Sequence, residues 1–198
     1  MNNGMNITLN LPGNALLIGE MGIGNSSAAA MLLSRLTDND IGSCTGSGTG
    51  MFGDDLKTKT VILEKVLKKH KDAKEPLDAL AAFGGLEIAT LAGAVIQAAS
   101  ERRVIVVDGF IASSAVLVAS KIEPAVLDYC IFSHRSDEHG HSLMLREMGA
   151  DPLLDLKLRL GEGSGAALAW PLLISASAIL RDMASFETAG VSRDDDKK

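Results

Sequence analysis

The sequence predicts a doubly wound α/β fold, in which helices cover a parallel sheet. Three short apolar runs, 15–18, 104–107 and 128–132, have the length of buried strands, and helical patterns follow them. Most strand ends carry a glycine and a polar residue, which is typical of the ligand-binding edge of such sheets. Hydrophobic residues make up 46% of the 198 residues, so the chain can bury the core of one α/β domain.

The first predicted strand leads into a glycine turn. Residues 1–14 are polar, contain the turn signal Pro12-Gly13, and offer no clear element of their own. The run 15–18 then stops at Gly19-Glu20-Met21-Gly22-Ile23-Gly24, and an alanine-rich helix extends from Ser26 to about Leu36. The start of a helix directs unpaired N–H groups and the positive end of its dipole outward. This turn therefore favours an anion, most often a phosphate.

A second glycine-rich loop covers 44–50, where alternating glycines would let a ligand approach the backbone closely. A linker without a ligand is the alternative interpretation. The next helix is expected from Asp54 to about His70. Lys57 and Lys59 lie in its first turns, where cations oppose the helix dipole. One of them could serve an anionic ligand, although two solvated lysines are the simpler interpretation.

The middle of the chain holds the clearest strand. Pro76 begins a helical pattern that reaches Val95 and is interrupted at Gly84-Gly85. The β-branched run 104–107 follows and ends in Asp108, at the edge where parallel sheets bind ligands. An apolar helix is expected over 111–121.

The last third begins with a short helical or turn segment at 124–128. A strand at 128–132 ends in Ser133-His134, and a helix at 141–148 follows. Residues 153–160 are predicted to be extended or helical. A glycine turn with Glu162 at its centre leads into a long apolar helix, expected from Ala166 to about Phe186. The charged tail 192–198 is expected to be disordered.

Composition excludes several classes of partner. The net charge of −6 argues against nucleic acid, which requires clustered lysine and arginine. The apolar run 166–180 contains Pro171 and two serines, so we expect it to be too short and broken for a membrane, which needs about 20 residues. No signal peptide is visible, and the two cysteines, Cys44 and Cys130, fit free thiols in the cytoplasm.

Common catalytic and cofactor motifs are absent. The glycines of the first turn have the wrong order for a dinucleotide site, and the turn lacks the lysine of a Walker A loop. Ser133 and His134 are adjacent on a strand, so their side chains should point to opposite faces and form no nucleophile–base pair. His134, His139 and His141 could hold a metal, but a solvated loop is favoured.

Four acids remain as candidates for proton transfer: Glu20, Glu87, Asp108 and Glu162. Glu162 is the most suggestive, because a glycine turn at a helix N-terminus leaves its carboxylate little shielded. A helix-capping or salt-bridged glutamate is the alternative role.

Several motifs together carry a family resemblance: GEMGIGNSSAAA, TGSGTG, LAAFGGLEIATLAGA, VDGFIASSA, FSHRS, LRLGEGSGAALA and MASFETAGV. This series resembles the nicotinate-nucleotide–dimethylbenzimidazole phosphoribosyltransferase family (CobT), from Leu16 to Val191. The resemblance implies a Rossmann-like parallel sheet flanked by helices in three layers. It also implies transfer of phosphoribose from nicotinate mononucleotide to 5,6-dimethylbenzimidazole, for the lower ligand of cobalamin, with no metal or organic cofactor.

The resemblance also assigns site residues. The glutamate of the family's L-G-E-G-[ST]-G motif is the general base and matches Glu162, and the family's phosphate-contacting lysine aligns best with Lys59. The expected substrate-binding residues are Gly19, Glu20, Met21, Gly22, Ile23, Gly24, Asn25, Gly48, Thr49, Gly50, Lys59, Asp108, Ser133, Gly161 and Gly163.

Family members are longer, with a large N-terminal portion before the first glycine turn that contributes part of the benzimidazole pocket. We therefore expect an atypical segment at 1–14, a partial α/β domain at 15–191 and a tail at 192–198. The products would be α-ribazole 5′-phosphate and nicotinate. The alternative is a truncated or split form that binds the mononucleotide but needs the missing portion or a partner chain. The family implies a cytoplasmic homodimer.

Overall fold

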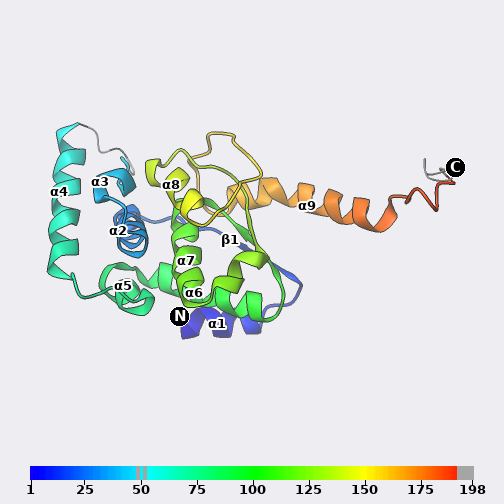
Figure 1. Cartoon of the computed structure of the whole chain (residues 1–198), viewed down its shortest axis with the longest axis horizontal. Coiled ribbons are helices and arrows are strands. Elements are labelled where there is room, and N and C mark those ends of the chain that lie inside the picture. The colour runs from blue at the N-terminus through cyan, green and yellow to red at the C-terminus, as the bar shows by residue number, and fades with distance from the viewer. Residues whose placement is uncertain (48–49, 51–52, 191–198) are drawn as a thin grey trace, which may run out of the picture.

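The computed structural model describes residues 1–47, 50 and 53–190, and its centre is a parallel sheet (Figure 1). The strands β1 (Ala15–Ile18), β2 (Val104–Val107) and β3 (Cys130–Phe132) lie in the order β1-β2-β3, with all pairs parallel. Ile18 pairs with Val107, which pairs with Phe132. The carboxyl ends of the strands therefore meet at one edge, and the predicted α/β fold class is confirmed.

A bridge follows the end of β3. Leu154 forms a parallel bridge with His134, and its N–H donates to Ser133 O at 3.0 Å. The sequence left 153–160 open between extended and helical; the structure makes it an irregular segment without a helix, in which Leu154 forms the bridge and Lys157 has φ 56°.

Helices surround the sheet. Their bounds are α1 (Asn2–Leu9), α2 (Asn25–Thr37), α3 (Ile41–Cys44), α4 (Asp54–Lys69), α5 (Pro76–Phe83), α6 (Leu86–Ser100), α7 (Gly109–Ile122), the 3-10 helix η1 (Pro124–Tyr129), α8 (His139–Glu147) and α9 (Ser164–Asp182). The predicted interruption at Gly84-Gly85 separates α5 from α6. The short helix α3 has no counterpart among the predicted elements.

The helix α1 lies in the segment for which the sequence predicted no element. It packs along α6 (Figure 1). A Cβ on Gly4 would collide with the carbonyl oxygen of Thr90, and one on Gly93 with that of Met1. Because both positions are glycines, the two helices approach closely, and 1–14 becomes part of the packed body.

The core centres on α7, which packs against α2, α5, α6 and α8. On one face of the sheet, Ile105 and Val107 pack with Val95 of α6 and Val116 of α7. On the other face, the fully buried Ala166 and Ala169 of α9 lie where this helix contacts β1 and β2. Helices thus contact both faces of the sheet, as the doubly wound pattern predicted.

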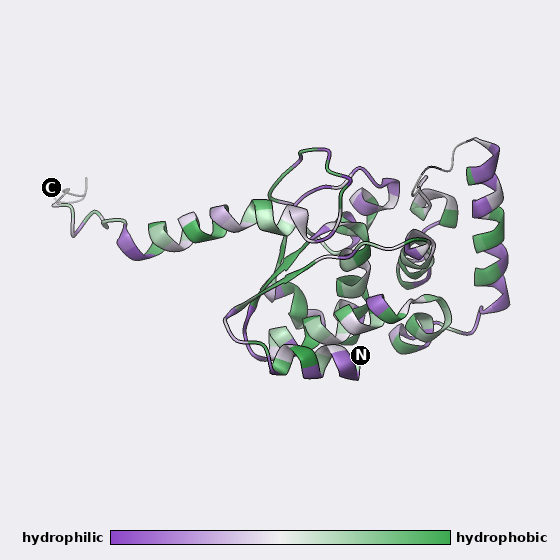
Figure 2. Ribbon diagram, turned by 180° about the vertical axis from the view of Figure 1, so that it is seen from behind, coloured by the Kyte–Doolittle hydropathy of each residue, from purple (hydrophilic) through white to green (hydrophobic). Residues whose placement is uncertain are grey.

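Beyond these first turns, α9 extends away from the body and carries apolar side chains into solvent (Figure 2). Leu172, Ile174 and Leu180 are 46%, 53% and 89% exposed. The long helix expected from Ala166 to about Phe186 is confirmed as 19 residues that end at Asp182, and it continues through Pro171, so the expectation of a broken run, which counted against a membrane span, is wrong. Within the described part of the chain, it is the one helix that length and composition alone would allow to cross a membrane, and 17% of its apolar window is buried. One such helix is weak evidence for a span.

Candidate functional site

A cavity of about 580 Å³ lies at the carboxyl edge of the sheet. The segments that follow all three strands line it, together with residues from the α3–α4 region and from the turn before α9. Its lining residues are Glu20, Met21, Gly22, Ile23, Gly24, Asn25, Ser26, Ser27, Ser47, Lys59, Asp108, Gly109, Phe110, Ile111, His134, Ser136, Glu138, Leu158, Arg159, Leu160 and Gly161. Open parallel sheets bind nucleotides at this edge.

The predicted site residues divide into three groups. Glu20, Met21, Gly22, Ile23, Gly24, Asn25, Lys59, Asp108 and Gly161 line the cavity. Gly19, Glu162 and Gly163 form the adjoining turns, Ser133 is buried beside His134, and Gly50 lies in an exposed turn. Gly48 and Thr49 lie outside the described residues.

The turn after β1 opens onto the N-terminus of α2. Gly24 takes a left-handed conformation with φ 89° and begins the helix, and no side chain caps its free N–H groups. Asn25 donates its side-chain N–H to the Glu20 carboxylate. Burial raises the pKa of Glu20, and the nearby Glu87 carboxylate adds to this effect, while the bond from Asn25 opposes it. This end of the cavity offers a helix dipole and free N–H groups to an anion.

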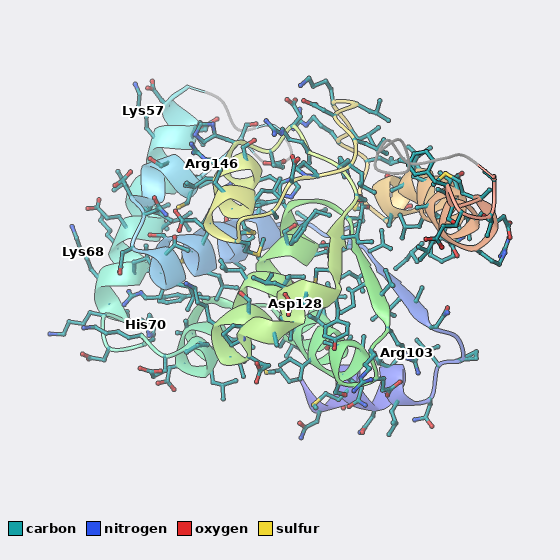
Figure 3. The ribbon with its side chains drawn as sticks, turned by 45° about the vertical axis from the view of Figure 1, so that its right-hand side comes forward. Lys57, Lys68, His70, Arg103, Asp128 and Arg146 are labelled. Atoms are coloured by element: carbon teal, nitrogen blue, oxygen red, sulfur yellow. The ribbon has the colours of Figure 1, made fainter. Side chains whose placement is uncertain are left out.

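Lys59 and Lys57 take different positions on α4. Lys57 pairs with Asp54 at 3.0 Å and, like Lys68, extends into solvent (Figure 3). Lys59 lines the cavity, donating to Gly46 O at 3.1 Å and to Ser26 Oγ at 3.4 Å. Burial lowers the pKa of Lys59, although the Glu138 carboxylate opposes the shift. Of the two lysines that the sequence left open, Lys59 is therefore the one placed to meet an anion.

The lowered pKa of Lys59 predicts a pH dependence of anion binding. Lys59 loses its proton at a lower pH than an ordinary lysine, so affinity for inorganic phosphate should begin to fall before pH reaches the ordinary lysine pKa of about 10.4. Loss of a charge-assisted contact should weaken binding by about tenfold or more. Calorimetry measures this, and Lys59→Arg should remove the decline because arginine stays charged. Lys57→Arg is the matched control and should leave the decline in place. The assignment would be contradicted if Lys57→Arg abolished the decline and Lys59→Arg did not.

The turn that carries Glu162 packs in direct backbone contact with the first glycine turn. Three consecutive residues, Gly161, Glu162 and Gly163, have φ values of 80°, 60° and 81°. The N–H of Glu162 donates to Glu20 O at 3.2 Å, and a Cβ on Gly19 would collide with the backbone nitrogen of Gly163. The side chain of Glu162 is exposed beside the cavity. Glu162 does not itself line the cavity, whereas its neighbour Gly161 does.

The sequence did not assign two buried lining residues to the site, Phe110 and the polar His134. The expectation that Ser133 and His134 point to opposite faces is wrong, because β3 ends at Phe132, and Ser133 Oγ lies 3.3 Å from His134 Nδ1. Ser133 nevertheless donates its hydroxyl proton to Val107 O at 2.8 Å and is fully buried, which leaves it no role as a nucleophile. The sequence did contain a signal for His134: it follows the end of one predicted strand, as Asp108 follows the end of another.

His141 supports the loop at 134–138 from behind. Its Nδ1 accepts from the N–H of Ser136 at 3.0 Å, so Nε2 carries the proton and donates to Ser113 Oγ at 3.1 Å. Burial lowers its pKa to about 3, with His134 and Arg135 adding to the effect and Asp108 opposing it. His139, by contrast, is exposed. Residues 1–47, 50 and 53–190 contain no group of three or more metal-ligating side chains.

The lowered pKa of His141 predicts that the folded chain becomes less stable as pH falls. An unfolded histidine binds a proton near pH 6.5 and the folded one only near pH 3, so the free energy of unfolding decreases as pH falls through this interval. The slope can reach about 1.4 kcal/mol per pH unit. Urea unfolding at several pH values measures it. His141→Gln should flatten the slope and His139→Gln should not; equal slopes in all three proteins would contradict the role of His141.

The fold and the cavity place this chain in the class of open α/β proteins whose binding site lies at the carboxyl edge of a parallel sheet. The phosphoribosyltransferase family matches residues 1–191. The chain belongs to the nicotinate-nucleotide–dimethylbenzimidazole phosphoribosyltransferase family (CobT), as its motifs predicted.

Named relatives support this membership. A nicotinate-nucleotide–dimethylbenzimidazole phosphoribosyltransferase from Variovorax paradoxus is 65% identical over 98% of this chain and 55% of its own length. One from Ralstonia nicotianae is 55% identical over 92% of this chain and 51% of its own length. The crystal structure of CobT from Thermus thermophilus superposes with a TM-score of 0.89 at 37% identity, over 96% of this chain and 58% of that one. The chain thus spans about half the length of the relatives it matches.

Proposed function

We propose that this chain provides the mononucleotide side of a phosphoribosyl transfer from nicotinate mononucleotide to 5,6-dimethylbenzimidazole. The products would be α-ribazole 5′-phosphate and nicotinate, for the lower ligand of cobalamin. The observation that carries the proposal is the joining, at one cavity, of an anion-binding turn with Lys59 to a turn that presents a glutamate.

The 5′-phosphate would bind the free N–H groups of α2 and the ammonium of Lys59. This places the ribose toward Asp108 and the glycine turn that carries Glu162. Glu162 removes the N–H proton of the benzimidazole, and the lone pair of the other ring nitrogen forms the bond to the anomeric carbon. The bond to nicotinate breaks on the opposite face, and its electron pair returns to the pyridine nitrogen, so no proton is needed for departure. The configuration inverts from β to α.

A second candidate is a form that binds the mononucleotide but needs another polypeptide for the transfer. One observation favours it: apolar side chains that line the cavity are exposed to solvent. Met21, Ile23 and Leu160 are 64%, 92% and 66% exposed. An aromatic acceptor, or the polypeptide that helps to enclose it, would cover them.

The same proposal includes a homodimer in the cytoplasm, without nucleic acid or membrane partners. The exposed apolar residues of α9 offer a surface for self-association, and both cysteines are free thiols.

One experiment separates the candidates. The purified chain is incubated with nicotinate mononucleotide and dimethylbenzimidazole, product is followed by chromatography and mass spectrometry, and mononucleotide binding by calorimetry. Product supports complete transfer by this chain. Binding without product, with turnover restored by the separately expressed N-terminal half of the Variovorax paradoxus relative, supports the second candidate. Neither binding nor product contradicts both.

A further inference from the structure

The turn that carries Glu162 is attached to the neighbouring strand ends through a buried carboxylate. The N–H of Gly165, in the first turn of α9, donates to Asp108 Oδ1 at 3.1 Å. A Cβ on Gly165 would collide with Asp108 Oδ1 and with His134 Nδ1. A glycine here lets the helix start press directly against this pair of side chains.

His134 shares the same carboxylate oxygen. Its Nδ1 lies 3.0 Å from Asp108 Oδ1, and the side chains of His134 and Asp108 are 4% and 0% exposed. Because Ser133 gives its only hydroxyl proton to Val107 O, its oxygen accepts from His134 Nδ1. The proton therefore resides on Nδ1, directed between Asp108 and Ser133. This places two donors, Gly165 N–H and His134 Nδ1–H, around Asp108 Oδ1.

Two features of this arrangement lower the stability of the fold, so stability does not explain why they are present. Asp108 Oδ2 is buried and has no hydrogen-bond partner among the residues that the structure describes, and burying a carboxylate oxygen without a partner is unfavourable. The turn itself is strained, because Glu162 has φ 60° and a non-glycine residue in that conformation costs about 1 kcal/mol or more. Two bonds tie this strained region to the turns after β1 and β2: Glu162 N–H to Glu20 O, and Gly165 N–H to Asp108.

We propose that Asp108 and His134 are positioning residues for Glu162. His134 orients the Asp108 carboxylate, Asp108 fixes the start of α9, and the fixed helix start holds Glu162 in its left-handed conformation beside the cavity. The inference rests on the proposed function only in giving Glu162 the role of base. Loosening the pair should lower the rate of proton removal and leave mononucleotide affinity nearly unchanged.

A matched pair of substitutions tests the geometry without any assay of activity. His134→Asn places an amide nitrogen near the position of Nδ1, whereas His134→Gln places it near Nε2. Amide hydrogen exchange by NMR is measured at Glu162 and Gly165, whose N–H groups donate to Glu20 O and to Asp108 Oδ1. His134→Gln should exchange about tenfold faster at both amides, the effect of one lost hydrogen bond, and His134→Asn should stay near the original rate. Equal exchange in the two variants overturns the proposal.

A second measurement covers the case in which both variants unfold. In the unsubstituted chain, the amide of Gly165, which donates to Asp108, should exchange with solvent more slowly than the amide of Ser26, which is also the second residue of its helix but lies at a helix start without a side-chain cap. Equal exchange at these two amides overturns the proposal.

Kinetics then separate this proposal from the proposed function. If the chain, alone or complemented, makes product, His134→Gln should lower kcat by about tenfold or more with the KM for nicotinate mononucleotide within about threefold, and His134→Asn should recover most of kcat. A raised KM with unchanged kcat overturns the positioning role. If no product forms, the proposed function fails, and the exchange experiment still decides whether Asp108 and His134 hold the turn.

Discussion

Glu162→Gln is expected to lower the rate of phosphoribosyl transfer by about 10²–10⁴-fold, the usual contribution of a general base. Glutamine keeps the size of the side chain and the backbone bond from Glu162 N–H to Glu20 O, but it cannot accept the benzimidazole proton. Calorimetric affinity for nicotinate mononucleotide should change little, because the phosphate contacts lie at α2 and Lys59. The measurement is initial rates of α-ribazole 5′-phosphate formation, with the complementing N-terminal half present if the chain requires it.

The matched control for this variant is Glu64→Gln. Glu64 lies on the exposed face of α4 and pairs with Lys68 at 2.8 Å, so its loss should leave the rate unchanged. Full activity of Glu162→Gln would remove Glu162 from the mechanism. A large loss of mononucleotide affinity would instead assign it to ground-state binding.

Gly19→Ala should damage both stability and activity. The added Cβ meets the backbone nitrogen of Gly163, which has no rotamer by which to move aside, so the two turns must separate. Overpacking of this kind costs about 1–3 kcal/mol in the free energy of unfolding. Because the displaced turn carries Glu162, the transfer rate should also fall, by about tenfold or more. Urea unfolding measures the stability loss, and initial rates measure the second effect.

Gly42→Ala is the control for the added methyl group. Its Cβ would meet Asp40 Oδ2, which accepts from Ser43 N–H at the start of α3, so the variant disturbs this helix cap and no contact of the cavity. It should lose about 1 kcal/mol of stability, the usual value of a helix cap, and no activity. Equal behaviour of the two variants would show that the contact between Gly19 and Gly163 does not constrain the site.

The strands and most helices could be predicted because their signals are local. Ala15–Ile18 and Val104–Val107 are apolar runs bounded by turn residues, and Gly84-Gly85 interrupts a helix by its own propensity. The helix α1 could not be predicted in this way. Its residues are polar, and it is stabilised by close packing of Gly4 and Gly93 with segments distant in sequence. Likewise, 153–160 forms no helix, because Leu153, Leu154 and Leu158 make backbone hydrogen bonds to the residues at and after the end of β3.

The candidate site was predictable where a residue follows a strand. Glu20 and Asp108 come directly after glycine-turn and strand signals, and both line the cavity. His134 was missed because the alternation rule for strands was applied to Ser133 and His134, two residues beyond the end of β3. Which of Lys57 and Lys59 faces the cavity depends on how α4 packs, and neighbouring lysines carry no information about that packing.

The contact between the two glycine turns has a consequence for synthesis on the ribosome. Gly19 leaves the ribosome well before its partner Gly163, so their contact has a large sequence separation and should form late. A nascent chain that has completed β1, α2 and β2 would already present the anion-binding turn, with nothing yet packed against Gly19. Ligand capture would thus be possible before the glutamate arrives, and mononucleotide could assist the folding of the remaining C-terminal third.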